Sequence, residues 1–350
     1  MTTSKHKVIY DTDPGVDDAM ALVFQALHPD IALLGLTSVF GNATIETTTR
    51  NARYLAGRFA PGVPVARGAA APLERAAPEP LARIHGDNGL GNIALAMVEE
   101  AVEKAVEQGV KQAVDQAVDQ AVDQAPLDAR PAHRFIIDTV RAHPGAVTLL
   151  AVGPLTNLAL ALADDPGIAA LVKQVVIMGG AFGTGGVLGN VTPAAEANML
   201  GDPDAADFVL GAAWPVTIVG LDVTQLTIMS RRYLASLRER GGAAGQFVWD
   251  VSRHYEAFHQ ESAQLQGIYA HDASAVAYLL APHLYTTRSG PVRVLTEGIA
   301  VGQTIQKPST LPVPAPDWDH RPDCNVCVGV DVQGVLALYE RTLCGTLGRN

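Results

Sequence analysis

The stretch Asp11-Thr12-Asp13-Pro14-Gly15-Val16-Asp17-Asp18 decides how this 350-residue chain begins to fold. The apolar run Val8-Ile9-Tyr10 before it predicts a buried strand, and residues 17–27 after it predict a helix. Pro14 and Gly15 are typical of the sharp turn between two such elements. A strand, a tight turn and a helix make the first unit of an open α/β sheet, in which ligands lie beyond the carboxyl ends of the strands.

Four carboxylates lie within this one turn, and like charges so close together repel one another unless a cation neutralises them. One or two aspartates would suffice to cap the helix and to favour its positive end. Oxygen-only ligand sets suit hard divalent cations such as calcium or magnesium. The turn therefore predicts a site for a metal ion or a polyhydroxylated ligand.

The rest of the chain alternates apolar strands with helices, which favours an α/β fold with an open, mostly parallel Rossmann-like sheet and helices on both faces. Further strands are expected at 31–39, 147–152, 175–178 and 216–221, with 291–295 and 326–332 closing the sheet. Helices are expected at 44–56, 130–142, 158–163 and 333–343, and over most of 231–281. No composition shift marks a boundary, so residues 1–350 are predicted to form a single domain.

One segment departs from this pattern and is expected to be a helical low-complexity insertion at 101–125. From Ala101 to Gln124 the sequence runs in tetrads, of which the last three are all Ala-Val-Asp-Gln. A period of four drifts against the helical period of 3.6, so the apolar stripe winds slowly round the helix. We expect a surface extension rather than a part of the core.

Composition argues against several classes of partner. The formal net charge of −11 disfavours binding to a nucleic-acid backbone. The three cysteines, Cys324, Cys327 and Cys344, do not make a disulfide framework. The first seven residues are polar and no apolar run is long enough to span a bilayer, so we expect a soluble, cytoplasmic protein with no membrane partner.

Polar residues that could bind a ligand follow several of the predicted strands. The set is rich in carboxylates and amides and poor in lysine and arginine, which does not suit a phosphate pocket. It suits a neutral polyhydroxylated ligand, such as a sugar, held on a hard cation. Besides the aspartate cluster, the set comprises Asn42, His85, Asp87, Asn88, the Val152 backbone, Glu196, Asn198, His271 and Asp272.

These segments resemble the inosine-uridine preferring nucleoside hydrolase family. The resemblance runs in one order from the first strand to about Val332, with the insertion unfamiliar. It implies a calcium-dependent N-ribohydrolase that releases free base and ribose from small-molecule nucleosides. The segments that carry it are Asp11 to Ala19, Gly41-Asn42, Ile84-His85-Gly86, Val152 to Asn157, Met178-Gly179-Gly180, Asn190 to Asn198, and His271-Asp272.

The resemblance also implies roles for single residues. Asp13, Asp18 and Asp272 would supply carboxylate ligands to Ca²⁺, and the carbonyl of Val152, where the family often has Thr, a backbone ligand. Asp13 would also act as the base on a calcium-bound water, whose pKa the ion lowers. The residues implied to bind the substrate are Asp17, Asn42, His85, Met178, Glu196 and Asn198.

The leaving base needs a proton, and His271 is the candidate acid because an unperturbed histidine pKa suits proton donation near neutrality. His85 is the other candidate for this role. The base is expected to meet residues 255–269, where Phe258, Ser262 and Gln266 recur at helical spacing, whereas His259 is expected to be a packing or surface residue.

Two alternatives stay open from the sequence. A haloacid-dehalogenase-like phosphatase also begins with Asp-x-Asp after a strand, but it expects Thr or Val where Gly15 stands. A non-catalytic nucleoside- or sugar-binding protein would keep the pocket without turnover. Base preference cannot be predicted, and the resemblance implies a homo-oligomer, a tetramer or a dimer.

Overall fold

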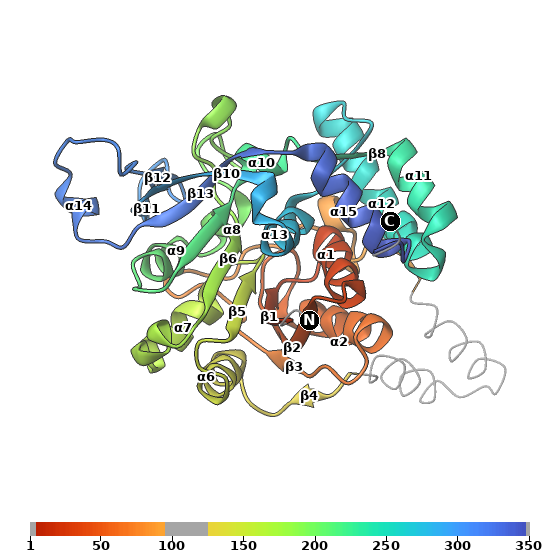
Figure 1. Ribbon diagram of the computed structural model, residues 1–350, viewed down its shortest axis with the longest axis horizontal. Coiled ribbons are helices and arrows are strands. Elements are labelled where there is room, and N and C mark those ends of the chain that lie inside the picture. Colours follow the sequence, from red (N-terminus) through yellow and green to blue (C-terminus); the bar gives the residue numbers. More distant parts are fainter. Residues whose placement is uncertain (1–4, 95–124, 348–350) are drawn as a thin grey trace.

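The described strands form one large sheet and two small ones. The computed structural model describes residues 5–94 and 125–347, so the predicted insertion lies outside the described residues except for Ala125. The large sheet has nine strands in the order β10-β13-β7-β6-β5-β1-β2-β3-β4 (Figure 1). They are β1 (His6–Thr12), β2 (Ile31–Ser38), β3 (Val65–Arg67), β4 (Leu127–Asp128), β5 (Val147–Ala151), β6 (Gln174–Met178), β7 (Val216–Val219), β10 (Tyr285–Gly290) and β13 (Cys324–Val330).

Every neighbouring pair in this sheet is parallel except β10 with β13, which confirms the predicted open, mostly parallel α/β sheet. The central strands are apolar and buried on both faces, as expected where helices cover a parallel sheet on both sides. Side chains alternate between the faces, so Val8 and Tyr10 join one buried apolar cluster and Ile9 joins the other.

Helices cover the two faces of the sheet in two groups (Figure 1). One face packs against α6 (Ala132–Ala142), α7 (Thr156–Asp164) and α9 (Pro203–Leu210). The other face packs against α1 (Val16–Leu27), α2 (Ile45–Phe59), α11 (Arg231–Arg240), α12 (Gly242–Ala263), α13 (His271–Leu280) and α15 (Val332–Leu343). Among the described helices, none is both long and apolar enough to cross a membrane.

One prediction about the edge of the sheet is wrong. Residues 291–295 do not close it, because β11 (Val292–Val294) pairs with β12 (Thr304–Gln306) in a separate two-stranded sheet. The antiparallel edge strand is β10, whose interior residues are largely exposed and polar. An edge strand needs little apolar surface, so β10 lacks the pattern that would have predicted it. The other small sheet pairs β8 (Ile228–Ser230) with β9 (Gly267–Tyr269).

Short helices stand close to the carboxyl ends of the central strands, where they carry polar residues from distant parts of the chain. The loop after β1 leads directly into α1, and the loop after β2 leads into α2. These short helices are α3 (Ala82–His85), α8 (Ala197–Gly201) and α10 (Leu221–Thr224). A fourth short helix, α14 (Pro316–Asp319), lies on the side of the molecule that carries β11 and β12 (Figure 1).

Candidate active site

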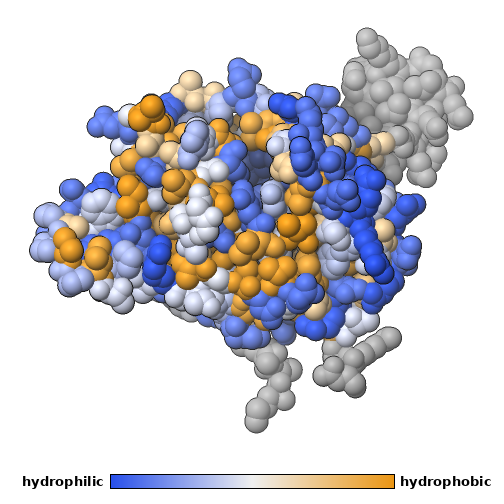
Figure 2. Space-filling view, turned by 90° about the horizontal axis from the view of Figure 1, so that it is seen from above, coloured by the Kyte–Doolittle hydropathy of each residue, from blue (hydrophilic) through white to orange (hydrophobic). Residues whose placement is uncertain are grey.

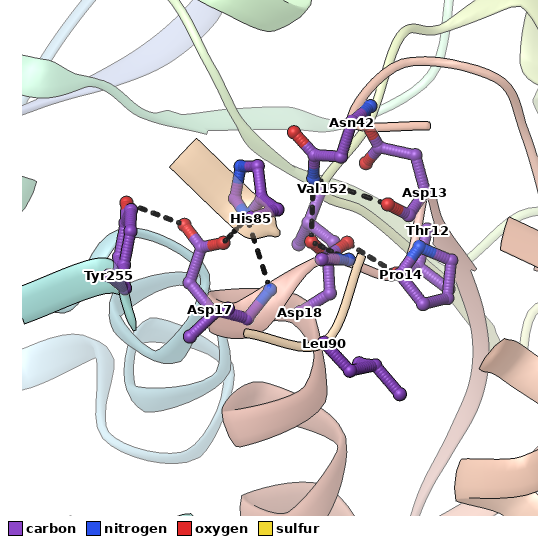
Figure 3. A network of polar contacts seen from close by, with 12 residues as sticks. Thr12, Asp13, Pro14, Asp17, Asp18, Asn42, His85, Leu90, Val152 and Tyr255 are labelled. Carbon is purple, nitrogen blue, oxygen red and sulfur yellow. Dashed lines mark hydrogen bonds and ion pairs between the residues drawn. The ribbon is translucent and has the colours of Figure 1, made fainter. Parts of the chain in front are cut away.

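Hydrogen bonds fix the carboxylate of Asp18 in the first turn of helix α1. The backbone N–H of Gly15 donates to Asp18 Oδ2 at 2.9 Å, and the Thr12 hydroxyl donates to Asp18 Oδ1 at 2.5 Å. The side-chain amide of Asn42, from the loop after β2, donates to Asp18 Oδ2 at 2.9 Å. Asp18 is 1% exposed, so its carboxylate is fixed in place by three donors (Figure 3).

Asp13 lies in a slot between two glycine-bearing loops. The backbone N–H of Asn42 donates to Asp13 Oδ2 at 2.8 Å, while Oδ1 has no hydrogen-bond partner among the described residues. A Cβ at Gly41, where φ is +150°, would stand 2.1 Å from Asp13 Oδ2, and a Cβ at Gly153 would stand 2.6 Å from Oδ1. The glycines therefore let both loops close on the carboxylate, and its free oxygen is available to a cation or a water molecule.

Three carboxylates form a cluster that could hold a metal ion. One side-chain oxygen each from Asp17, Asp18 and Asp272 lie within 4.8 Å of one another. Burial raises the pKa of Asp17 and of Asp18 to about 6. Burial, together with the neighbouring carboxylates, raises the pKa of Asp13 and of Asp272 well above the usual value. Carboxylates buried at such a density are stabilised either by protons or by a cation.

The donor set fits a hard divalent cation, because it consists of oxygen atoms. The structure brings Asp18 and Asp272 together as predicted, adds Asp17 to the cluster, and places Asp13 close enough to interact with the charges of Asp18 and Asp272. Val152 directly follows β5, and its carbonyl accepts a hydrogen bond from Asn198 Nδ2 at 2.7 Å.

A cavity of about 300 Å³ opens over this cluster. Most of the residues predicted to bind a ligand line it, whereas Asp13 lines an adjacent hollow of about 220 Å³ and Asp11 and Asp18 line neither. Asp87 and Asn88 do not line it, and Asn88 instead organises its own loop by accepting from the backbone N–H of Leu90 at 2.8 Å. The predicted residues in the wall are Asp17, Asn42, His85, Val152, Met178, Glu196, Asn198, His271 and Asp272.

Glu196 and Asn198 enter the cavity from the start of α8. The Glu196 carboxylate accepts from the backbone N–H groups of Asn198 at 2.9 Å, Gly180 at 2.8 Å and Met199 at 3.1 Å. Asn198 Nδ2 also approaches the Met178 carbonyl at 3.2 Å, which connects α8 to the ends of β5 and β6. The amide and carboxylate at this end of the cavity are therefore held by backbone bonds.

The two predicted histidines are both neutral in this environment. Burial lowers the pKa of His85 to about 4 and that of His271 to about 3. The backbone N–H of Val16 donates to His85 Nδ1 at 3.1 Å, so the neutral ring carries its proton on Nε2. His271 Nδ1 lies 2.7 Å from the Thr224 hydroxyl. The expectation of an unperturbed histidine pKa at residue 271 is therefore wrong.

An arc of rings lines the part of the cavity wall next to the carboxylates, and we call this part the ring end. His85 stacks on Tyr255 at 5.5 Å between ring centres, and Tyr255 meets His259 edge to face at 4.3 Å. Tyr269 follows, 5.0 Å from His259 and 5.5 Å from His271. The Tyr255 hydroxyl also donates to Asp17 Oδ2 at 3.4 Å, which links the arc to the carboxylates (Figure 3).

Sequence reasoning placed two residues of this region wrongly and missed others. His259 lines the cavity rather than only packing, and its signal was its position one helical turn after Tyr255 on α12. Gln266 lies outside the cavity wall, because α12 ends at Ala263. Phe258 and Ser262 line the cavity as expected. Asn190 is a wall residue from a segment that carries the resemblance, and Gln225 is a wall residue that sequence patterns did not single out.

Comparison with known proteins gives consistent matches over nearly the whole chain. The model of the family described as inosine-uridine preferring nucleoside hydrolase matches residues 8–337. Uridine nucleosidase 1 of Arabidopsis thaliana is 38% identical over 342 residues, which cover 97% of this chain and 94% of that protein. The inosine-uridine preferring nucleoside hydrolase of Leishmania major is 35% identical, with 85% of this chain and 87% of that protein covered.

Solved structures agree with the sequence matches. A plant nucleoside hydrolase superposes with a TM-score of 0.81 at 33% identity, over 97% of this chain and 99% of that one. A purine-preferring ribonucleoside hydrolase from Gardnerella vaginalis gives a TM-score of 0.81 at 31% identity, over 97% of this chain and 98% of that one.

Proposed function

This chain belongs to the inosine-uridine preferring nucleoside hydrolase family, and we propose that it hydrolyses ribonucleosides to free base and ribose with calcium at the acidic cluster. Enzymes of this family are N-glycosidases that act on nucleosides. The observation that carries the proposal is the cavity itself, whose wall holds buried carboxylates beside an arc of aromatic and imidazole rings. A ribose carries hydroxyls and a nucleobase carries an aromatic face, so one nucleoside matches both parts of the wall.

The carboxylate end would bind the ion and the sugar. Asp13, Asp18, Asp272 and the Val152 carbonyl would hold calcium, which when bound lowers the pKa of water and orients it. Asp13, whose Oδ1 has no partner among the described residues, would accept the proton of the attacking water. The residues proposed to bind ribose hydroxyls or pack against the sugar are Asp17, Asn42, Met178, Glu196 and Asn198.

Charge on these residues suits the transition state of N-glycosidic cleavage. Positive charge builds on the ribose ring as the bond to the base breaks, and preorganised carboxylates nearby stabilise that charge. Asp17 and Glu196 both line the cavity, and backbone bonds hold Glu196 in place before any substrate arrives. Glu196 therefore needs no reorientation to act on that charge.

The ring end would receive the base and supply its proton. His271 is the proposed donor, with His85 as the second candidate. Because both rings are neutral, the donor would be the Nε2–H of an imidazole rather than an imidazolium. If the Thr224 hydroxyl donates to His271 Nδ1, Nε2 carries that hydrogen.

The composition of the cavity wall and the measurement of turnover distinguish the proposed hydrolase from the two alternative functions. No lysine or arginine lines this cavity among the described residues, which disfavours the phosphatase alternative. A binding protein without turnover would bind ribose equally well, so turnover must be measured. The direct test is reducing-sugar release from uridine, inosine, cytidine, adenosine and guanosine, with phosphate release from p-nitrophenyl phosphate as a comparison.

We expect ribose release from uridine and inosine, since matched relatives are named for these substrates, and no phosphate release. Ribonucleoside binding without any ribose release would instead support the binding protein. Release of phosphate would support the phosphatase.

We also propose that the protein is a cytoplasmic homo-oligomer, a dimer or a tetramer. Figure 2 shows apolar residues exposed over the middle of one face, and such surfaces are buried when copies of a chain associate. Light scattering after size-exclusion chromatography measures the mass directly, and a monomer at all concentrations would contradict the proposal.

A further inference from the structure

The side-chain amide of Gln225 is an unused polar group in the wall of the cavity. Gln225 follows the last residue of α10 and is half-buried. Its backbone N–H donates to the Leu221 carbonyl at 3.2 Å, whereas its side chain has no hydrogen-bond partner among the described residues. A half-buried amide in a cavity wall gains most when a ligand supplies both an acceptor and a donor.

Other polar groups at the ring end are already engaged. The Ser262 hydroxyl donates to the Phe258 carbonyl at 2.8 Å, and His259 Nδ1 lies 2.9 Å from the Tyr255 carbonyl. The Tyr255 hydroxyl donates to Asp17. Among the described residues at this end, Gln225 therefore offers the one carboxamide whose donor and acceptor are both unused.

The place of Gln225 in the chain sets it beside the proposed proton donor. The preceding residue, Thr224, bonds to His271 Nδ1 at 2.7 Å. Asp222, two residues earlier, anchors α10 by accepting from the backbone N–H groups of Phe182 at 2.8 Å and Thr184 at 2.7 Å. The amide is thus carried by a fixed element that also holds His271.

We propose that Gln225 is a specificity-determining residue that binds the polar edge of the nucleobase. The inference rests on the proposed function and adds to it the part of the substrate that is recognised. A carboxamide pairs with any edge that has a donor beside an acceptor, as in the lactam of uracil and hypoxanthine. Ribosides whose leaving group lacks such an edge gain nothing from this residue.

The test compares two classes of substrate in two variants. Gln225→Met keeps the length of the side chain but removes donor and acceptor, and Gln225→Glu keeps the shape but cannot donate. Gln260→Met is the matched control, because Gln260 is exposed on α12 and does not line this cavity. Uridine and inosine carry the polar edge, whereas p-nitrophenyl riboside does not.

We expect both Gln225 variants to lose roughly tenfold in kcat/KM on uridine and inosine, mainly through KM. On p-nitrophenyl riboside they should match the wild type within about twofold. Equal losses on both substrate classes, or no loss on nucleosides, would overturn the inference.

Nucleoside binding, measured by calorimetry, separates failure of this inference from failure of the proposed function. If the wild type releases no ribose but binds uridine, weaker binding by Gln225→Met than by Gln260→Met still supports the role of Gln225. Equal binding by the two variants, or no binding by the wild type, overturns it.

Discussion

At the scale of single residues, Asp13 has the environment expected of a general base. Its carboxylate is 2% exposed, one oxygen is held by a backbone N–H, and the other has no partner among the described residues. The family resemblance implied the role, but the slot between Gly41 and Gly153 appears only when three loops meet. The sequence places the residues, whereas the tertiary structure creates the free oxygen.

Asp13→Asn should therefore fold normally and lose turnover. The amide keeps the shape but cannot accept a proton, so we expect kcat to fall by about 10³-fold with uridine. Asp87→Asn, on a neighbouring loop outside the cavity wall, is the control. Turnover near the wild-type value in folded Asp13→Asn protein would exclude Asp13 as the base.

The two histidines can be distinguished by the leaving group of the substrate. His271→Ala should lower kcat on uridine by about 10²-fold and should spare p-nitrophenyl riboside, whose leaving group departs without a proton. His85→Ala should show less of this difference, because His271 is the proposed donor. If His85→Ala shows the larger difference between the substrates, the two roles are reversed.

At the scale of elements, the site depends on how strand ends are held together. Asn157, in the first turn of α7, is fully buried and donates to Asp11 Oδ1 at 2.8 Å and to the Ser38 carbonyl at 2.9 Å. It also accepts from the backbone N–H of Ala69 at 2.9 Å. One side chain therefore joins the ends of β1 and β2 to the loop after β3.

We predict that Asn157→Ala lowers stability and slows turnover. Loss of three buried hydrogen bonds should cost about 2–3 kcal/mol in the free energy of unfolding. Because the loops that carry Asp13 and Asn42 lose their brace, kcat should fall more than KM rises. Urea unfolding and steady-state kinetics measure the two effects, with Asn325→Ala, exposed on β13, as the control. An effect on KM alone would contradict the positioning role.

Sequence patterns predicted most central elements because these elements are strongly apolar. Strands β1, β2, β5, β6 and β7 lie close to their predicted places. Strand β10 was missed because it is polar, and residues 292–294 were assigned to the wrong sheet because an apolar run does not specify its partner. His259 and Gln225 were missed for a related reason, since their role depends on which distant elements surround them.

At the scale of the whole molecule, ionisation of the buried carboxyl groups lowers the stability of the metal-free protein. Burial raises the pKa of Asp11 to about 7, and the pKa values of Asp13 and Asp272 lie well above the usual one. An acid whose pKa is raised on folding contributes stability at low pH and loses it as pH rises through the folded pKa. His85 and His271 have lowered pKa values, and an unfolded histidine is about half protonated at pH 6.5, so each opposes this loss by only about 0.4 kcal/mol between pH 6.5 and pH 8.

The free energy of unfolding of the metal-free protein should therefore fall between pH 6.5 and pH 8. The expected loss is about 1–3 kcal/mol, and calcium should restore more stability at pH 8 than at pH 6.5. Urea unfolding in chelator and in calcium measures both, and Asp13→Asn should have a shallower slope. A metal-free stability that stays constant or rises over this range would contradict the account.

The described residues also bear on the domain organisation. All the described residues that line the cavity lie outside the segment at 101–125, which we propose is an insertion into a single domain. Replacing residues 101–124 by a short flexible linker should leave kcat/KM within about twofold of the wild type. A folded deletion variant without activity would show that the segment contributes to function.

The central claim is that the acidic cluster holds calcium that nucleoside hydrolysis requires. The most direct measurement is ribose release from uridine as a function of free calcium, starting from protein treated with a chelator. The account predicts no release without the ion, a saturable rise as calcium is added, and loss of that rise in Asp18→Asn. Full activity in excess chelator would contradict it.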